Sequence, residues 1–324
     1  MWLSEFGGPE VLVAADAPDP APGPGQALIE VEYANITFVQ TQLRADSGPF
    51  SLELPVIPGN GVGGVVSAVG AGVDPGLAGR RVVSSLGGSG GYAELAVVDA
   101  GALVKVPEGV ALDDAVALLA DGRTAVSLVR TVGLAEGDRA LVEAAAGGVG
   151  SLLVQLARAA GARVVAAAGG TAKLELAREL GAEAALDYRE PDWPERVREA
   201  FGGLDVVFDG VGGQVGASAF ELLDSGGRML RFGLASGEWA AISEEAAAER
   251  RVELVSMARP TPEEMRAQTE TALAEAAAGR LRPVIGQRFP LERAAEAHAA
   301  IESRQTVGKT LLEVARGAPR AGNR

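Results

Sequence analysis

The sequence has no cysteine and only one histidine, His298, among its 324 residues. Without cysteine the chain has no disulfides, no thiol nucleophile and no thiolate ligands for zinc. His298 shares a predicted helical face with Leu291, Ala294 and Ile301, so we expect it to pack in the interior rather than to bind a metal or act as a base. A conventional zinc site and a serine–histidine–aspartate triad are therefore not expected.

The sequence also lacks an excess of positive charge and any long apolar run. Its net charge is −14, which argues against nucleic acid or an anionic membrane as a partner, because both bind basic surfaces. No apolar run is long enough to span a bilayer, and the chain begins with a charged, strand-like segment rather than a signal peptide. We expect a cytoplasmic protein. A composition of 48% hydrophobic and 22% charged residues is that of an ordinary globular chain.

The most informative segment is residues 139–160, which reads as a buried strand, a glycine-rich turn and an amphipathic helix. Ala145, Gly147 and Gly150 reproduce the dinucleotide-binding spacing, with alanine in place of the first glycine. Such a turn lets the backbone approach a pyrophosphate and directs the positive end of a helix toward it. A second predicted strand, 163–168, completes a βαβ unit, and the sequence therefore predicts nucleotide binding.

The residues after that second strand indicate which nucleotide binds. An NAD-selective site usually has Asp or Glu here for the ribose 2′-hydroxyl, whereas this chain has Gly169, Gly170 and then Lys173. The glycines leave room for a 2′-phosphate, and Lys173 can supply a positive charge to it. Alternatively, Lys173 is an ordinary solvated residue of the predicted helix 173–180. A cation near a helix N-terminus is unfavourable unless an anion binds there, so we expect NADPH.

The arrangement of predicted elements indicates two domains. Residues 1–115 are β-rich, with strands expected at 27–33, 64–69, 81–85 and 92–98. Helix 113–132 then opens an alternating α/β region with six expected strands, at 139–143, 163–168, 184–186, 205–208, 228–232 and 252–255. Six strands are the number in a doubly wound parallel (Rossmann) sheet. We expect a surface helix at 243–250.

The remaining C-terminal segments exceed what a six-stranded sheet needs. Helices at 261–279 and 291–303 and a strand at 309–314 are expected to fold back onto the first domain, and the tail 316–324 is expected to be disordered. We therefore expect one domain from residues 1–117 with 260–324, and a nucleotide-binding domain from residues 118–259.

Motifs along nearly the whole chain resemble the medium-chain dehydrogenase/reductase superfamily. Within it, the chain is similar to the zinc-free quinone oxidoreductase (zeta-crystallin-like) branch. The matching segments are 58–59, 64–66, 69–73, 79–82, 91–94, 144–150, 176–181, 187–188, 205–209, 211–213 and 307–309.

The resemblance implies a GroES-like catalytic domain beside the Rossmann sheet, a substrate cleft between the domains, and a homodimer formed through the nucleotide-domain sheet. It also implies cofactor residues. Those near the pyrophosphate would be Gly147, Gly148 and Val149, and those around the adenosine 2′-phosphate would be Gly169, Gly170, Lys173 and Tyr188. Thr124, Phe232 and Gly233 would lie beside the nicotinamide, and Ala146 and Lys309 are further predicted cofactor-binding residues. Tyr188 could instead cap a strand, and Phe232 could be a core residue.

The predicted substrate region departs from the family pattern. Thr37 stands where Asn is common, Gln40 where Asp is common, and Gln42 where Tyr is frequent, while Asn60 and the glycine after it replace the His-Glu of zinc-bearing relatives. The candidate catalytic residues are Thr37, Gln40, Asn60, Tyr92 and Thr124. None of these is an obvious general acid.

These observations favour an NADPH-dependent oxidoreductase that transfers hydride, without a metal, to a small apolar electrophile. The expected acceptor is an activated C=C bond, as in an enone, enal or enoyl group, or a quinone. Hydride transfer needs little covalent help from the protein, which must position the reactants and stabilise the developing charge. The alternative is a cofactor-binding family member without hydride transfer, with a structural or regulatory role or a non-redox activity such as cyclisation. The departures at Thr37, Gln40 and Gln42 motivate that alternative.

Overall fold

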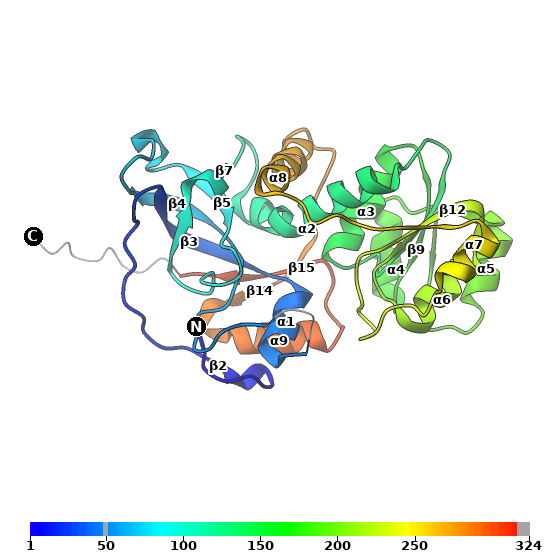
Figure 1. Ribbon diagram of the computed structural model, residues 1–324, viewed down its shortest axis with the longest axis horizontal. Coiled ribbons are helices and arrows are strands. Elements are labelled where there is room, and N and C mark those ends of the chain that lie inside the picture. The colour runs from blue at the N-terminus through cyan, green and yellow to red at the C-terminus, as the bar shows by residue number, and fades with distance from the viewer. Residues whose placement is uncertain (48–50, 316–324) are drawn as a thin grey trace, which may run out of the picture. The chain divides into compact units, whose positions relative to one another are not determined.

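The computed structural model describes residues 1–47 and 51–315 (Figure 1). The expected disorder of residues 316–324 falls outside these ranges. Contacts within the chain divide it into two compact units, one formed by Met1–Ala120 with the chain from Val284, and the other by Asp121–Pro283. None of the helices in the described ranges is both long and apolar enough to cross a membrane.

The second unit contains the expected six-stranded sheet. Its strands are β8 (Arg139–Glu143), β9 (Arg163–Ala167), β10 (Ala184–Leu186), β11 (Leu204–Asp209), β12 (Leu223–Arg231) and β13 (Glu253–Val255). All neighbouring strands are parallel, in the order β10-β9-β8-β11-β12-β13. This order confirms the doubly wound prediction. It also places the topological switch point, where ligands bind in such sheets, between β8 and β11.

Helices cover both faces of this sheet. They are α3 (Gly148–Ala159), α4 (Thr171–Glu179), α5 (Trp193–Phe201), α6 (Gly213–Glu221) and α7 (Glu244–Arg250), with α2 (Leu112–Val132) before β8 and α8 (Pro262–Ala277) after β13. α3 and α4 contact β8, β9 and β10. α5, α6 and α7 share one apolar core with the other face, and Figure 1 shows these three helices gathered together. The expected surface helix at 243–250 is α7, whose Ala247 is buried in that core.

The chain from 260 to 283, which we expected with the first domain, belongs to the second unit. Polar contacts tie α8 to α2, because Arg130 donates to the Thr271 hydroxyl at 3.3 Å and Gln268 donates to the Ser127 hydroxyl at 3.4 Å. Beyond α8, the N–H of Arg282 donates to the Gln155 side chain at 2.9 Å.

The first unit is built on a seven-stranded sheet. Its strands are β3 (Gln26–Ile36), β4 (Gly61–Val69), β5 (Arg81–Ser85), β6 (Leu95–Asp99), β7 (Val104–Lys105), β14 (Ile285–Pro290) and β15 (Lys309–Glu313), and β1 (Trp2–Leu3) pairs with β2 (Leu12–Val13). Its helices are α1 (Phe38–Ala45) and α9 (Ala294–Glu302), with short 3-10 turns at Pro9–Val11, Pro75–Leu77, Ala100–Ala102 and Leu291–Arg293. β15 pairs with β3, so the C-terminal segment returns to the first domain as predicted.

The core of the second unit should be sensitive to loss of volume beneath the dinucleotide turn. Leu141, in the central strand β8, is fully buried. We expect Leu141→Ala to lower the free energy of unfolding by about 2–4 kcal/mol, because it leaves a cavity that the sheet cannot close. Met257→Ala, at an exposed position in the same unit, is the control and should change the free energy of unfolding by less than about 1 kcal/mol. Equal losses in urea denaturation would contradict this account of the core.

Candidate functional site

The turn after β8 packs closely against the start of α3, as is typical of dinucleotide-binding turns. The N–H of Gly147 donates to the carbonyl of Ala144 at 2.8 Å, and α3 begins directly afterwards at Gly148. A Cβ on Gly150 would lie 2.3 Å from the Ala144 carbonyl oxygen, so only glycine allows this close approach of helix and turn. The first N–H groups of a helix have no acceptor within the helix. Backbone donors therefore gather at the switch point, where Ala146 is buried and Val149 is half-buried.

Helix α2 places a carboxylate beside the same turn. A Cβ on Gly148 would lie 1.9 Å from an Asp121 carboxylate oxygen, and Asp121 is only 7% exposed. Burial lowers the pKa of Arg123, and the negative charge of Asp121 opposes that shift. Thr124, in the next position of α2, is half-buried. Thr124 belongs to the second unit, whereas the other four predicted catalytic residues belong to the first.

The turn after β9 brings together most of the residues predicted for the 2′-phosphate. Gly169 and Gly170 precede α4, and Lys173 is half-buried in the first turn of that helix. The Tyr188 ring comes within 3.6 Å of where a Gly169 Cβ would stand. The sequence analysis missed a further cation, since Arg189 also lies beside Gly169, 3.3 Å from the same Cβ position.

The segment after β12 returns to the end of β11. The N–H of Phe232 donates to the Asp209 carbonyl at 2.9 Å, and the N–H of Gly233 approaches it at 3.3 Å. The Phe232 ring packs against Gly210. A Cβ added to Gly210 would lie 2.8 Å from the ring's Cζ atom. Phe232 and Gly233, predicted to lie near the nicotinamide, are thus half-buried at the carboxyl edge of the sheet.

Two fully buried carboxyl groups at this edge were missed by the sequence analysis. Glu143 ends β8 and Asp209 ends β11, which are neighbouring strands. The N–H of Val211 lies 3.2 Å from Glu143 and 3.0 Å from Asp209, and the N–H of Gly212 donates to Asp209 at 2.6 Å. Burial and the adjacent Asp209 raise the pKa of Glu143 well above its usual value. An acid that ends each of two buried strands was the signal that could have found this pair.

In the first unit, Tyr92 and Gln40 belong to an interior hydrogen-bond network. The fully buried Tyr92 hydroxyl lies 2.9 Å from His298 Nε2 and 3.3 Å from the Gln40 side-chain oxygen. That oxygen also accepts the N–H of Thr37, the half-buried residue before α1, at 2.8 Å. Burial raises the pKa of Tyr92 and lowers that of His298 to about 3, so both groups are neutral at physiological pH. His298 is buried, as predicted.

A buried charge lies close to this network. The Arg44 side chain is 2% exposed and forms an ion pair with Glu302 of α9. Two of its nitrogens, Nε and Nη1, have no hydrogen-bond partner among the described residues. Gln40, one helical turn earlier in α1, supplies no negative charge to this arginine. The carboxylate of Glu302 therefore compensates the positive charge of Arg44.

Asn60 and Lys309 also have structural neighbours. The side-chain oxygen of Asn60 accepts the N–H groups of Leu86 at 3.2 Å and Gly88 at 2.8 Å, which fixes the glycine-rich segment that follows β5. Lys309 begins β15 in the first unit and is 4% exposed. The other predicted cofactor residues all belong to the second unit.

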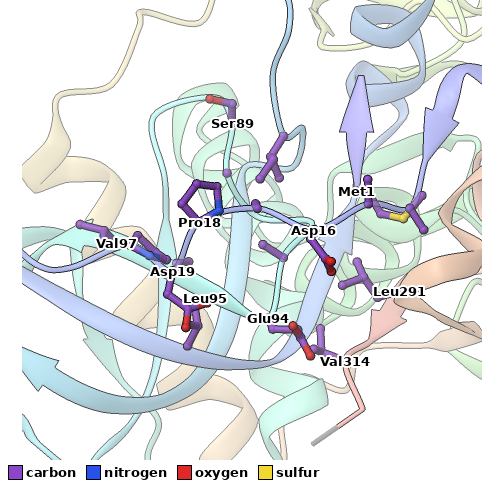
Figure 2. Close-up of a pocket in the computed structure, with 18 of the residues that line it drawn as sticks. Met1, Asp16, Pro18, Asp19, Ser89, Glu94, Leu95, Val97, Leu291 and Val314 are labelled. Carbon is purple, nitrogen blue, oxygen red and sulfur yellow. The ribbon is translucent and has the colours of Figure 1, made fainter. Parts of the chain in front are cut away.

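The first unit contains a cavity of about 740 Å³ (Figure 2). Its walls include Met1, Asp16, Glu94, Leu95 and Leu291. None of the five predicted catalytic residues lines it. Within the described ranges, no group of three or more His, Asp or Glu side chains is arranged to hold a metal ion.

Comparison with known proteins identifies the family. A family model described as a zinc-binding dehydrogenase matches residues 148–275, and one described as an alcohol dehydrogenase GroES-like domain matches residues 23–108. The quinone oxidoreductase of Pseudomonas aeruginosa is 33% identical over 319 residues, which cover 96% of this chain and 98% of that protein.

This chain belongs to the quinone oxidoreductase branch of the medium-chain dehydrogenase/reductases. Solved structures agree with this. The Escherichia coli quinone oxidoreductase, complexed with NADPH, has a TM-score of 0.87 and 29% identity, covering 96% of this chain and 98% of that one. A structure described as an NAD-dependent alcohol dehydrogenase has a TM-score of 0.88 and 32% identity, covering 97% and 99%. Close relatives thus carry names that point to different dinucleotides.

The carboxyl pair should make this family member less stable as the pH rises. Folded Glu143 has a raised pKa and unfolded Glu143 an ordinary one, so above the ordinary value the folded state binds more protons and stability falls with pH. Glu143→Gln keeps an acceptor for Val211 and gains a donor for Asp209. We expect it to raise the free energy of unfolding by about 1–2 kcal/mol near pH 8, with the gain shrinking toward about pH 5.

The control for this prediction is Glu183→Gln in the same unit. Glu183 is exposed, and its hydrogen bonds with Arg163 lower its pKa, so the substitution should not stabilise the protein at high pH. Urea denaturation across pH measures both variants. A gain for Glu143→Gln that does not vary with pH would contradict a raised pKa of Glu143 in the folded state.

Tyr92→Phe separates a structural from a catalytic role for the buried hydroxyl. We expect it to lower the free energy of unfolding by about 1–2 kcal/mol, because His298 Nε2 loses its partner in the interior, and to leave turnover largely unchanged. Tyr33→Phe, at a half-buried tyrosine in β3, is the matched control. Unchanged stability together with a large loss of turnover would show that Tyr92 acts on the substrate.

Proposed function

We propose that this chain is an NADPH-dependent oxidoreductase that transfers hydride to a quinone or to an activated C=C bond of an enone, enal or enoyl compound. The observation that carries the proposal is the glycine turn at the switch point, where a side chain on Gly150 would collide with the Ala144 carbonyl oxygen. A backbone packed this closely suits the approach of a pyrophosphate, as in relatives solved with NADPH.

The residues of the second unit fit a dinucleotide. Gly147, Gly148 and Val149 would hold the pyrophosphate at the start of α3, and Phe232 and Gly233 would lie beside the nicotinamide. Gly169, Gly170, Lys173 and Tyr188 would surround the adenosine 2′-phosphate. Because β9 ends in Ala167 and the turn after it carries no acid, the usual partner of the NADH 2′-hydroxyl is missing there. This favours NADPH, although one relative is named for NAD.

NADPH, when bound, supplies the hydride. The chain must bind an electrophile and stabilise the oxygen on which negative charge develops. Thr37, Gln42 and the Asn60 amide are half-buried donors of the first unit suited to that oxygen. Phe38 and Val39 follow Thr37 and are 36% and 38% exposed, which suits an apolar substrate. The network of Tyr92, Gln40 and His298 would hold α1 in position, and water can deliver the final proton. We further propose a homodimer formed through the nucleotide-domain sheet.

Loss of NADPH absorbance against a panel of quinones, enals, enones and enoyl thioesters tests the proposal, with NADH in parallel. We expect stoichiometric oxidation with one electrophile class and a preference for NADPH. Tight binding of NADPH by calorimetry without turnover on any electrophile would contradict the hydride transfer and favour the non-redox alternative. Thr37, Gln40 and Gln42, which depart from the usual family residues, are the observation on which that alternative rests.

Lys173→Ala should weaken recognition of the 2′-phosphate without changing the chemistry. We expect the KM for NADPH to rise about 10- to 100-fold with kcat nearly unchanged, because the 2′-phosphate is remote from the transferred hydride. The KM for NADH should stay the same. If kcat falls as much as kcat/KM, Lys173 is not a ground-state contact to the cofactor.

A further inference from the structure

Arg189 forms a close ion pair beside the glycine turn that follows β9. Its Nη2 lies 2.6 Å from Asp187 Oδ2 and its Nε lies 2.9 Å from Asp187 Oδ1. Asp187 directly follows β10, and its carboxylate also accepts the N–H of Gly170 at 2.9 Å. The Arg189 hydrogen bonds, with the backbone N–H donors, lower the pKa of Asp187 to about 2, so the carboxylate is charged under all ordinary conditions.

The aspartate is therefore an acid at the adenosine end of the site, supplied by β10 rather than β9. A charged carboxylate on the N–H of Gly170 would repel a 2′-phosphate and would suit a ribose hydroxyl. It is 13% exposed, whereas the paired Arg189 side chain is 62% exposed. The arginine thus covers the carboxylate on its solvent side.

The two glycines determine where that guanidinium lies. A Cβ on Gly169 would stand 3.3 Å from Arg189 Cδ and Nε, and one on Gly170 would stand 3.3 Å from Nη2. Gly170 has a φ of +100°, a conformation that side-chain-bearing residues rarely adopt. Because neither glycine has a side chain, the Arg189 side chain can lie against their backbone, where the 2′-phosphate would bind.

We propose that Arg189 is a specificity-determining residue that neutralises Asp187 and gives the 2′-phosphate a second cation beside Lys173. This inference rests on the proposed NADPH-binding function. Counting Lys173, Arg189 and Asp187 alone, the site carries a net charge of +1. Loss of Arg189 brings it to zero and exposes a carboxylate. Because guanidinium binds phosphate through paired donors, Arg189 also contributes geometry that a lysine does not.

The charge count, together with the loss of the guanidinium donors in the double variant, orders four proteins by their preference for a 2′-phosphate. Asp187→Asn should prefer it at least as strongly as the wild type, the double variant Asp187→Asn/Arg189→Ala somewhat less, and Arg189→Ala least. Arg189→Lys should retain most of the preference, since it still offsets Asp187. A purely structural role would not follow this order, because Arg189→Ala and the double variant lose the same guanidinium contacts.

Calorimetry of the full chain with 2′,5′-ADP and 5′-AMP, and with NADPH and NADH, tests the inference. For Arg189→Ala we expect about 10-fold weaker binding of 2′,5′-ADP and NADPH, with 5′-AMP and NADH changed less than about 2-fold. The loss should be partly reversed in the double variant and should diminish at high salt. Arg266→Ala, which removes an exposed arginine paired with Glu270 in α8, is the control. It should change neither the affinity ratio of 2′,5′-ADP to 5′-AMP nor that of NADPH to NADH. Melting temperatures establish that each variant is folded.

The outcomes separate this inference from the proposed function. A wild-type protein that prefers 2′,5′-ADP, with a preference unchanged in Arg189→Ala, overturns the role of Arg189 and leaves NADPH as the cofactor. Equal weakening of all four ligands in Arg189→Ala also overturns it, because the residue would then support the turn alone. A wild-type protein without any preference overturns both proposals.

Discussion

The close approach of α3 to the turn after β8 is the constraint on which the rest of the site depends. The Gly150 Cα faces the Ala144 carbonyl oxygen at a separation that excludes even a methyl group. This contact sets the start of α3 at the switch point and so directs its N-terminal donors outward from the sheet edge. Ala144 itself adopts a positive φ of 48°, which costs an alanine about 1 kcal/mol. The packing of β8 and α3 on either side supplies the stability that maintains it.

The second theme is how an acidic chain can receive an anionic cofactor. The net charge is −14, and several carboxylates lie around the proposed dinucleotide site. Each has a neighbour that limits its field: Asp121 interacts with Arg123, burial and Asp209 raise the pKa of Glu143 and so favour its neutral form, and Asp187 is paired with Arg189. Local compensation rather than net charge therefore determines what the site can bind.

The sequence was sufficient to predict the parallel sheet, the glycine turn and the return of the C-terminal strand to the first unit, because each depends on local patterns of apolar residues and glycine. It did not reveal Arg189 or the Glu143–Asp209 pair, because the contacts of these residues depend on which strands become neighbours in the sheet. Tyr92 and Gln40 show the same limit. Both are catalytic candidates by sequence, but the interior contacts of their side-chain oxygens with His298 and Thr37 could not be predicted from it. Helix α8 was assigned by its place in the chain, but its side chains contact α2.

The central claim is that the second unit binds NADPH with the pyrophosphate at the start of α3 and the 2′-phosphate above Gly169 and Gly170. A crystal structure of the full chain grown with NADPH tests this most directly. The account predicts the pyrophosphate on the N–H groups of Gly148 and Val149, and the 2′-phosphate in contact with Lys173 and Arg189. A 2′-phosphate directed into solvent, or a dinucleotide located away from the β8 turn, would contradict it.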